Sequence, residues 1–252
     1  MMPILQLGPA ALPLPALLLM AGFWLGLDLT EKHAARFQVN AQLIYNMVLV
    51  AMLAGLLGAR LSYAIGSPDA FISSPFSLLQ LRPQMLDAQG GLLVAALAAL
   101  IYGQRRKLAL WPTLDALTSM FVVMMISMGL ANFASGDGFG APTTLPWAIE
   151  LWGAPRHPTQ VYETLAALLI AVATWPGSRL LARVPATGPG LRFWMFLALT
   201  GLSLVVFQAF RGDSVLLAGL RQAQLAGWAA LAASLWQIGK RLTRSSDGPG
   251  ID

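Results

Sequence analysis

Long apolar runs limit the fold of this chain more than any other feature. Seven of them approach or exceed the ~20 residues that a helix needs to cross a bilayer, and they lie at 11–28, 43–64, 90–103, 109–131, 160–176, 192–210 and 215–238. Because hydrocarbon cannot hydrogen-bond to backbone groups, spanning segments must be helices or closed barrels, and continuous runs favour helices. The sequence therefore predicts an all-α integral membrane protein with seven transmembrane helices.

The overall composition agrees with a bilayer environment. Hydrophobic residues make up 57% of the chain and charged residues 11%, which is more apolar than a typical soluble domain. The net charge of +5 does not indicate a nucleic-acid partner, because most basic residues flank the apolar runs. With no cysteine, the chain has no disulfide, thiol nucleophile or thiolate metal site of its own.

The basic residues also predict an orientation. Alternate connections between the runs carry most of them: Lys32, Arg36, Arg105, Arg106, Lys107, Arg179, Arg183, Arg192, Lys240, Arg241 and Arg244. By the positive-inside rule this side is cytoplasmic. No Lys or Arg precedes Lys32, so the first run lacks the positive start of a signal peptide and we expect it to be retained. We expect the N-terminus outside, one transmembrane domain over 1–240 and a cytoplasmic tail over 241–252.

The basic residues predicted on the other side are all arginines: Arg60, Arg82, Arg156, Arg211 and Arg221. Arginine near the membrane usually faces a bundle interior, a partner or a lipid headgroup, and its planar guanidinium suits phosphate. The alternative is that each side chain merely extends to the interface. That alternative is stronger for Arg82 and Arg221 than for Arg60 and Arg211, which lie in the motifs GARLSY and FRGD.

Two adjacent segments follow the fourth run. Residues 132–157 are rich in Gly, Pro and Trp and predict a small extracytoplasmic cap between helices 4 and 5; they contain no nucleotide-binding glycine motif. The next residues read RHPTQVYE, in which Pro158 suits the first position of helix 5 and His157 its cap. Gln160 and Glu163 lie in the same first turn. His157 and Glu163 either handle protons or only satisfy the helix end and pair with an arginine.

Several motifs, in order, resemble the prolipoprotein diacylglyceryl transferase family over most of residues 15–235. GARLSY at 58–63 resembles the family's GARLxY, QGGLL at 89–93 its HGGL turn, and Asn132 to Gly140 its RxGNFxNGE…G signature. PTTLPWA at 142–148 matches PTxLPWA, RHPTQVYE at 156–163 matches RHPxQLYE, FRGD at 210–213 resembles FFRxPD, and Gly219 with Gln224 and Leu225 resembles GLTMGQ.

The resemblance implies a reaction. The family moves a diacylglyceryl group from phosphatidylglycerol to the cysteine thiol in the lipobox of a prolipoprotein signal peptide, forming a thioether and releasing glycerol phosphate. This substitution at carbon needs a thiolate, an aligned C–O bond and cations for the departing phosphate. The resemblance also implies a multi-pass protein of the bacterial cytoplasmic (inner) membrane with its active site outside. No cofactor or metal is implied, since His33 and His157 are too few and too far apart in sequence.

The resemblance also implies roles for individual residues. Arg211 and Arg60 belong to the phosphate region, Asn132 and Gly140 shape the pocket, and His157 and Glu163 handle protons or orient an arginine. The catalytic set is thus Arg211, His157, Glu163 and Gln89, and the substrate-binding set is Arg60, Asn132, Asp137, Gly140, Arg156, Gln160 and Tyr162.

The chain departs from the family pattern at three positions. Gln89 replaces the histidine of the HGG turn, Gly129 replaces the arginine of the RxGNF signature, and Asp137 replaces a glutamate. Glutamine cannot exchange a proton near neutral pH. This leaves open a catalytically impaired relative that binds anionic lipid or a signal peptide without transfer. A small transporter is not supported, because Asp115 and Asn46 do not form a polar path through the spans.

Overall fold

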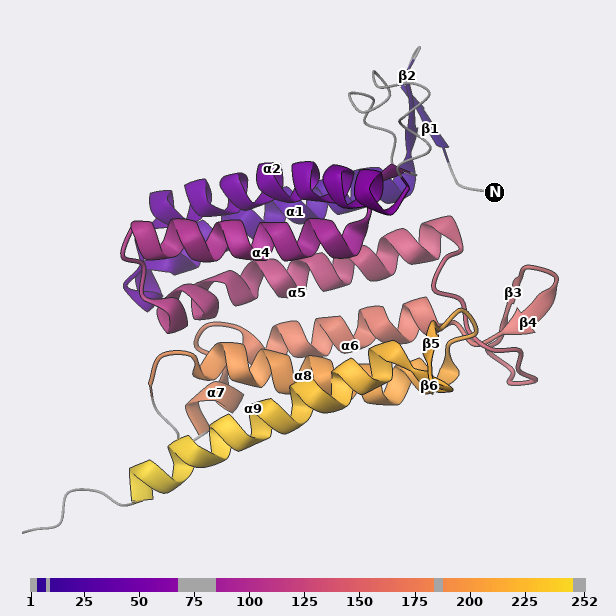
Figure 1. The fold of residues 1–252 in the computed structure, drawn as a ribbon. Coiled ribbons are helices and arrows are strands. Elements are labelled where there is room, and N and C mark those ends of the chain that lie inside the picture. Colours follow the sequence, from indigo (N-terminus) through magenta and orange to yellow (C-terminus); the bar gives the residue numbers. More distant parts are fainter. Residues whose placement is uncertain (1–3, 8–9, 68–84, 184–187, 247–252) are drawn as a thin grey trace, which may run out of the picture. The chain divides into compact units, whose positions relative to one another are not determined.

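The computed structural model is mostly helical, and its long helices lie where the apolar runs predict them (Figure 1). It describes residues 4–7, 10–67, 85–183 and 188–246. Arg82, one of the predicted outer arginines, lies outside the described residues. The long helices in these ranges are α1 (Leu14–Ala34), α2 (Ala41–Gly66), α4 (Ala88–Arg105), α5 (Leu110–Ser135), α6 (Thr159–Thr174), α8 (Leu191–Phe207) and α9 (Gln222–Ser246), with a short α7 (Arg179–Arg183).

Several of these helices can cross a membrane by length and composition. Four segments in the described part of the chain qualify, Leu14–Phe37, Ala41–Gly66, Leu110–Ser135 and Leu191–Phe210, and Thr159–Thr174 is apolar but shorter. These helices agree with a multi-pass membrane protein. The full set of seven spans and their orientation stay predictions.

Two short hairpins and a longer α5 correct three predicted boundaries. Strands β1 (Ile4–Leu7) and β2 (Ala10–Pro13) pair before α1, so the first helix begins at Leu14 rather than at residue 11. Strands β5 (Leu216–Leu217) and β6 (Leu220–Arg221) occupy the start of the predicted run 215–238, and α9 begins only at Gln222. The predicted cap from Asn132 to His157 is shorter as well, because α5 continues to Ser135. Aliphatic residues suit strands as well as helices, so periodicity alone does not place these ends.

The chain divides into two compact units, one of residues 38–113 and one of residues 1–37 with 114–252. In the first unit, α2 packs against α4 through small residues. A Cβ at Gly58 would lie 2.4 Å from Cβ of Val94, and one at Gly91 would lie 2.8 Å from Cβ of Ala59. Such small-residue contacts let two membrane helices approach closely where apolar burial gives no driving force.

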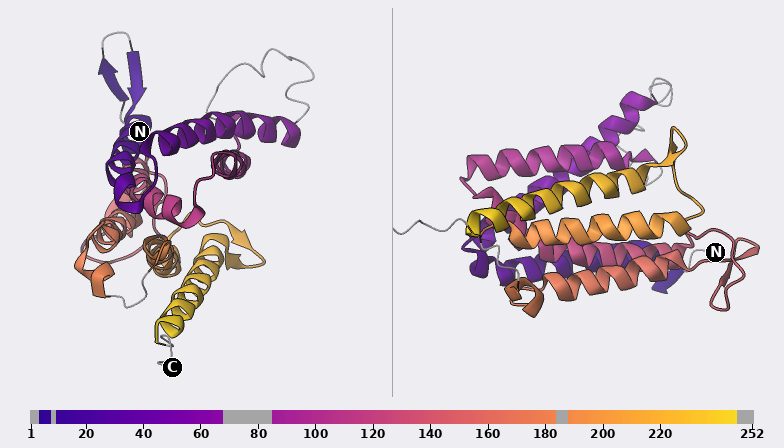
Figure 2. Two further views of the ribbon diagram at one scale, coloured as in Figure 1. Left: turned by 90° about the vertical axis from the view of Figure 1, so that its left-hand side faces the viewer. Right: turned by 90° about the horizontal axis from the view of Figure 1, so that it is seen from below.

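The second unit has an aromatic and aliphatic core. Val122, Ile170 and Phe196 are buried together, and Phe121 and Phe193 pack against them. Helices α8 and α9 lie side by side (Figure 2) and are closest at two glycines, where a Cβ on Gly201 would lie 2.7 Å from the carbonyl oxygen of Gly227. This packing places the end of α8, and the residues that follow it, beside the start of α9.

Two buried charged residues, Asp115 and Arg192, connect α5 to the start of α8. The carboxylate of Asp115 accepts from the backbone N–H groups of Gly190 (2.5 Å) and Phe193 (2.9 Å). Arg192 donates to the carbonyl of Thr174 (2.6 Å) and to Oγ of Ser119 (2.9 Å). Because these charges bind backbone groups at one helix end, they stabilise a connection and do not form a path through the spans.

Candidate active site

Arg211 lies between two carboxylates in the unit that contains α5 to α9. It follows a short 3-10 turn, Gln208–Phe210. Its Nε and Nη2 donate to the two oxygens of Asp213 at 2.9 and 3.1 Å, and its Nη1 donates to the carboxylate of Glu163 on α6 at 3.2 and 3.3 Å. Burial acts to lower the pKa of the Arg211 guanidinium, but Asp213 and Glu163 outweigh it and raise the pKa. The group is therefore a fixed cation, with 19% of its side chain exposed.

Backbone pairing joins this arginine to the cap. Gly140 and Arg211 form an antiparallel bridge, the N–H of Ala141 donates to Phe210 (2.7 Å) and the N–H of Gly212 donates to Phe139 (2.9 Å). A Cβ on Gly140 would lie 2.2 Å from the carbonyl oxygen of His157. Only glycine permits this convergence of three segments. The predicted role of Gly140 in shaping a pocket stays a prediction.

Gly138 separates two polar side chains. It has a φ of +64°, and a Cβ on it would lie 2.9 Å from Nη2 of Arg211 and 3.2 Å from Nδ2 of Asn132. The Asn132 amide and the Arg211 guanidinium therefore flank the same glycine. Gly138 was absent from the predicted site, as was Asp213. The only sequence signals for them were the glycine run at 136–140 and the FRGD motif.

The start of α6 binds the backbone of the cap. Thr159 donates through Oγ1 to the carbonyl of Gly138 (2.6 Å), and Gln160 donates through Nε2 to the carbonyl of Asp137 (2.9 Å). Both side chains are buried. The Asp137 residue is exposed, so its described contribution is made by its backbone. Gln160 is thus a support of the glycine turn that faces Arg211.

His157 is not the cap of α6. The residue at the N-cap is Pro158, which makes no side-chain capping bond, and the helix begins at Thr159. His157 instead donates its backbone N–H to Ala141 at 3.1 Å. The prediction was wrong because His157 belongs to an extended segment, which pairs with the extracytoplasmic segment at Ala141. Among the described residues, its buried Nδ1 atom has no hydrogen-bond partner.

Aromatic rings surround the His157 imidazole. The ring centroid lies 5.2 Å from that of Phe210 and 6.3 Å from that of Tyr162. The Tyr162 hydroxyl accepts from Nε1 of Trp147 in the cap at 2.8 Å. These contacts bring His157 and Tyr162 together with Phe210, the residue before Arg211.

Two other predicted outer arginines bind the protein's own carbonyl groups. Arg156 donates to the carbonyls of Leu151 (3.0 Å) and Gly140 (3.3 Å), and its guanidinium lies over the ring of Phe139. It closes the cap hairpin formed by β3 (Ile149–Leu151) and β4 (Ala154–Arg156). Arg221 donates to the carbonyls of Gln208 and Arg211. The guanidinium groups of Arg156 and Arg221, which we considered for anion binding, thus bind backbone carbonyls of the protein.

Arg60 and Gln89 lie in the unit of residues 38–113. Arg60 is 5% exposed and donates through Nη1 to the carbonyl of Met85 at 2.9 Å. Asp87 caps α4 by accepting from the N–H groups of Gln89 and Gly90, and Ser62 donates to it at 2.5 Å. The Ser62 hydrogen bond holds the pKa of the Asp87 carboxyl below its usual range. Gln89 is exposed in the first turn of α4.

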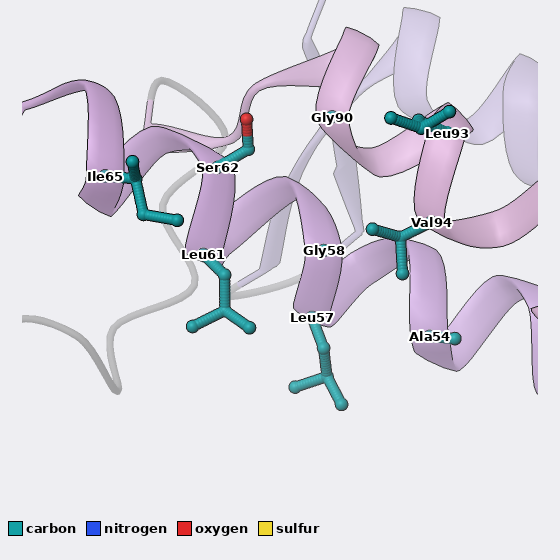
Figure 3. A pocket seen from close by; sticks show the side chains of 9 residues that line it. All are labelled: Ala54, Leu57, Gly58, Leu61, Ser62, Ile65, Gly90, Leu93 and Val94. Atoms are coloured by element: carbon teal, nitrogen blue, oxygen red, sulfur yellow. The ribbon is translucent and has the colours of Figure 1, made fainter. Parts of the chain in front are cut away.

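An apolar groove lies beside these residues on α2 and α4 (Figure 3). It has a volume of about 420 Å³, and Ser62 is the one residue with a polar side chain in its lining. The lining consists of Ala54, Leu57, Gly58, Leu61, Ser62, Ile65, Gly90, Leu93 and Val94. Its dimensions and composition suit a hydrocarbon chain.

Gly129 is explained by helix packing. A Cβ at this position would lie 2.2 Å from Oγ1 of Thr164 on α6. A side chain at residue 129 would therefore require the Thr164 side chain to move. Thr164 thus occupies the space that the arginine of the family signature would need.

Comparison with known proteins identifies relatives over nearly the whole chain. The family model described as prolipoprotein diacylglyceryl transferase matches residues 3–239. Three proteins named phosphatidylglycerol–prolipoprotein diacylglyceryl transferase are similar to the chain. The one from Nostoc sp. is 25% identical over 92% of this chain and 86% of the relative. Those from Synechococcus sp. (28%; 94% and 93%) and Streptococcus pneumoniae (30%; 87% and 86%) match comparably.

Proposed function

The chain belongs to the prolipoprotein diacylglyceryl transferase family, and from that membership we propose that it is a transferase acting on phosphatidylglycerol and a prolipoprotein. The lipobox cysteine sulfur attacks the carbon of the diacylglyceryl group that is bonded to the phosphate ester oxygen. The S–C bond forms, and the bond between that carbon and the oxygen breaks. Glycerol phosphate leaves with the bonding electrons, and the thiol proton passes to a base. The parts required are therefore a phosphate-binding cation and a proton acceptor.

The orientation of Arg211 carries this proposal. Its contacts with Glu163 and Asp213 fix the plane of the guanidinium, and the two terminal nitrogens carry two N–H groups each. Nη2 of Arg211 can therefore donate its second N–H group to a phosphate oxygen, and Gly138 beside it has no side chain in the way. A donor that is held in place before the reaction stabilises developing charge without reorganising. Glu163 in this proposal orients Arg211, and Asn132 adds a second donor beside it.

His157 is the proposed proton acceptor. Its Nδ1 atom is buried and free of partners within the described residues, and its ring is fixed by Phe210 and Tyr162. A buried nitrogen without a partner costs free energy unless it is used. Because Gln89 cannot accept a proton, His157 is the imidazole available near Arg211 for the thiol.

We assign the remaining predicted residues to the frame of the site. Arg156, Gln160, Tyr162 and the backbone of Asp137 hold the cap against α6, where the lipobox segment would bind. The other unit, taken by itself, offers the groove on α2 and α4 to a hydrocarbon chain, and Arg60 and Gln89 belong to that unit. The protein spans the bacterial inner membrane seven times, with the N-terminus and cap outside and the tail inside.

Complementation tests the function. The chain is expressed in a bacterium depleted of its own transferase, and thioether-linked lipid is measured on a reporter lipoprotein. We expect modification by the unaltered chain, and a loss of about 10²–10³-fold in turnover for Arg211→Ala at equal protein level. Arg105→Ala, an exposed residue at the end of α4, is the matched control and should keep full activity. Full activity of Arg211→Ala would contradict the phosphate assignment, and no modification by the unaltered chain would indicate a binding-only relative.

A further inference from the structure

A short apolar hairpin follows Arg211, and the proposed reaction gives it no role. Its strands β5 and β6 pair around a two-residue turn at Ala218 and Gly219, both with positive φ. This is the turn chemistry that two-residue hairpins favour. The four large aliphatic side chains of the hairpin are highly exposed: Val215 68%, Leu216 62%, Leu217 60% and Leu220 58%. A cluster of this kind marks a surface that contacts something apolar.

The apolar side chains lie on both faces of the hairpin. Successive residues of a strand point to opposite faces, so Leu216 and Leu217 do not share one. Leu217 pairs directly with Leu220, so these two do share a face. A protein partner that docked on one face would leave the other in water. Immersion in lipid covers both faces at once.

Exposed apolar side chains also occur on the helices before and after the hairpin. The residues before it on the α8 side include the exposed Val206 (43%) and Phe210 (39%), and α9 after it begins with the exposed Leu225 (38%) and Trp228 (55%). The segment Leu191–Phe210 is long and apolar enough to cross a membrane. Val215 to Leu220 contain no charged residue. Exposed apolar side chains therefore lie on both sides of the hairpin, and the exposed polar residues Asp213 and Gln222 lie at its two junctions.

Arg221 ties the base of the hairpin to Arg211. Its guanidinium donates to the backbone carbonyl of Arg211 at 2.7 Å, to the carbonyl of Gln208, and to Oγ of Ser214 at 3.2 Å. The N–H of Gln222 donates to the carbonyl of Val215 at 3.0 Å and closes the base. A displacement of the hairpin would therefore move the backbone that carries the Arg211 guanidinium.

We propose that this hairpin is a lipid anchor. The hairpin inserts its aliphatic side chains into the interfacial layer of the bilayer: Val215, Leu216, Leu217 and Leu220. Arg221 couples the depth of these side chains in the bilayer to the position of Arg211 along the membrane normal. The anchor thereby holds the guanidinium at the level of lipid phosphates. Its contact with lipid does not depend on catalysis, so it goes beyond the proposed function.

Site-directed spin labelling tests the anchor, because the chain contains no cysteine and Leu217→Cys supplies a single thiol. The labelled full-length protein is placed in phosphatidylglycerol–phosphatidylcholine vesicles, and collisions with oxygen and with a water-soluble nickel chelate are compared. Leu202→Cys on α8 is the lipid reference and Gln104→Cys, exposed at the end of α4, is the water reference. We expect position 217 to resemble position 202 and to lie about 5–10 Å into the headgroup–acyl boundary.

Labels at Leu220→Cys and Leu216→Cys extend the test to both faces and guard against a single perturbed variant. We expect both to report lipid. A label at 217 that matches Gln104→Cys overturns the proposal. So does protection from both collision agents that arises only when a lipobox peptide is added, which would make the hairpin a peptide-binding surface. Spin–spin broadening that vanishes on dilution with unlabelled protein would reveal a second copy instead. None of these readouts uses transfer activity, so failure here leaves the proposed function separately testable.

Discussion

Replacing Gly138 by alanine tests directly whether the placement of Arg211 matters for the reaction. The new Cβ would lie 2.9 Å from Nη2 of Arg211, whereas ordinary contacts begin at 3.4 Å. The guanidinium must therefore retreat by about 0.5 Å, since a methyl group on the backbone cannot yield. The backbone at residue 138 has a φ of +64°, which alanine also tolerates poorly.

These two effects have different magnitudes and different readouts. A left-handed alanine costs about 1–2 kcal/mol of folding free energy. A misplacement of about 1 Å in an active site can cost about 10²-fold in rate. Half of that shift predicts a loss of about tenfold or more in turnover for Gly138→Ala, beyond any effect of lower stability.

Gly153→Ala is the matched control. Gly153 also has a positive φ, of +74°, but a Cβ there would meet no atom within 4 Å. It therefore carries the backbone strain without the contact. Turnover is measured on purified protein in phosphatidylglycerol vesicles with a lipobox peptide, and thermal unfolding is followed in parallel. We expect similar losses of stability in both variants and a loss of turnover in Gly138→Ala alone. Equal turnover in the two variants would refute the reasoning about Arg211.

Three further predictions concern the departures from the family and the cap of α4. Gln89→His should raise turnover by about tenfold or more and add a histidine-like inflection to its pH profile, because general base catalysis contributes at least ~10²-fold; an unchanged rate would exclude this position from proton transfer. Gly129→Arg should lower the thermal unfolding temperature, and pairing it with Thr164→Gly should recover part of the loss, since Thr164 Oγ1 occupies the required space. Hydrogen bonds lower the folded-state pKa of the Asp87 carboxyl. Their contribution to folding stability is therefore present above the unfolded-state pKa and is lost as the pH falls through the folded-state pKa. Asp87→Asn should flatten the dependence of the unfolding temperature on pH below about pH 4.

Much of the helical framework was predictable from the chain alone. The backbone N–H and C=O groups of an apolar run cannot stay without hydrogen bonds inside a bilayer, so runs long enough to span it form helices. The exceptions were segment ends such as Val215 to Arg221, where the same aliphatic residues form a hairpin. The turn at Ala218 and Gly219 decides that outcome locally.

The candidate site was predictable as a set of residues but not as an arrangement. Motif resemblance selected Arg211, Glu163, His157 and Asn132, which the structure places in one compact unit, and their roles stay predictions. It did not indicate Gly138, whose importance arises only from the missing side chain beside Nη2 of Arg211.

The sequence by itself determined the membrane-type helices, the family and the residue types of the site, because these depend on composition, run length and local spacing. The tertiary structure decided what each arginine binds. Arg211 meets a carboxylate 48 residues away on α6, whereas Arg156 and Arg221 are committed to carbonyl groups. All three guanidinium groups are chemically identical, so only the partners that the fold brings to them distinguish a candidate phosphate ligand from a structural clamp.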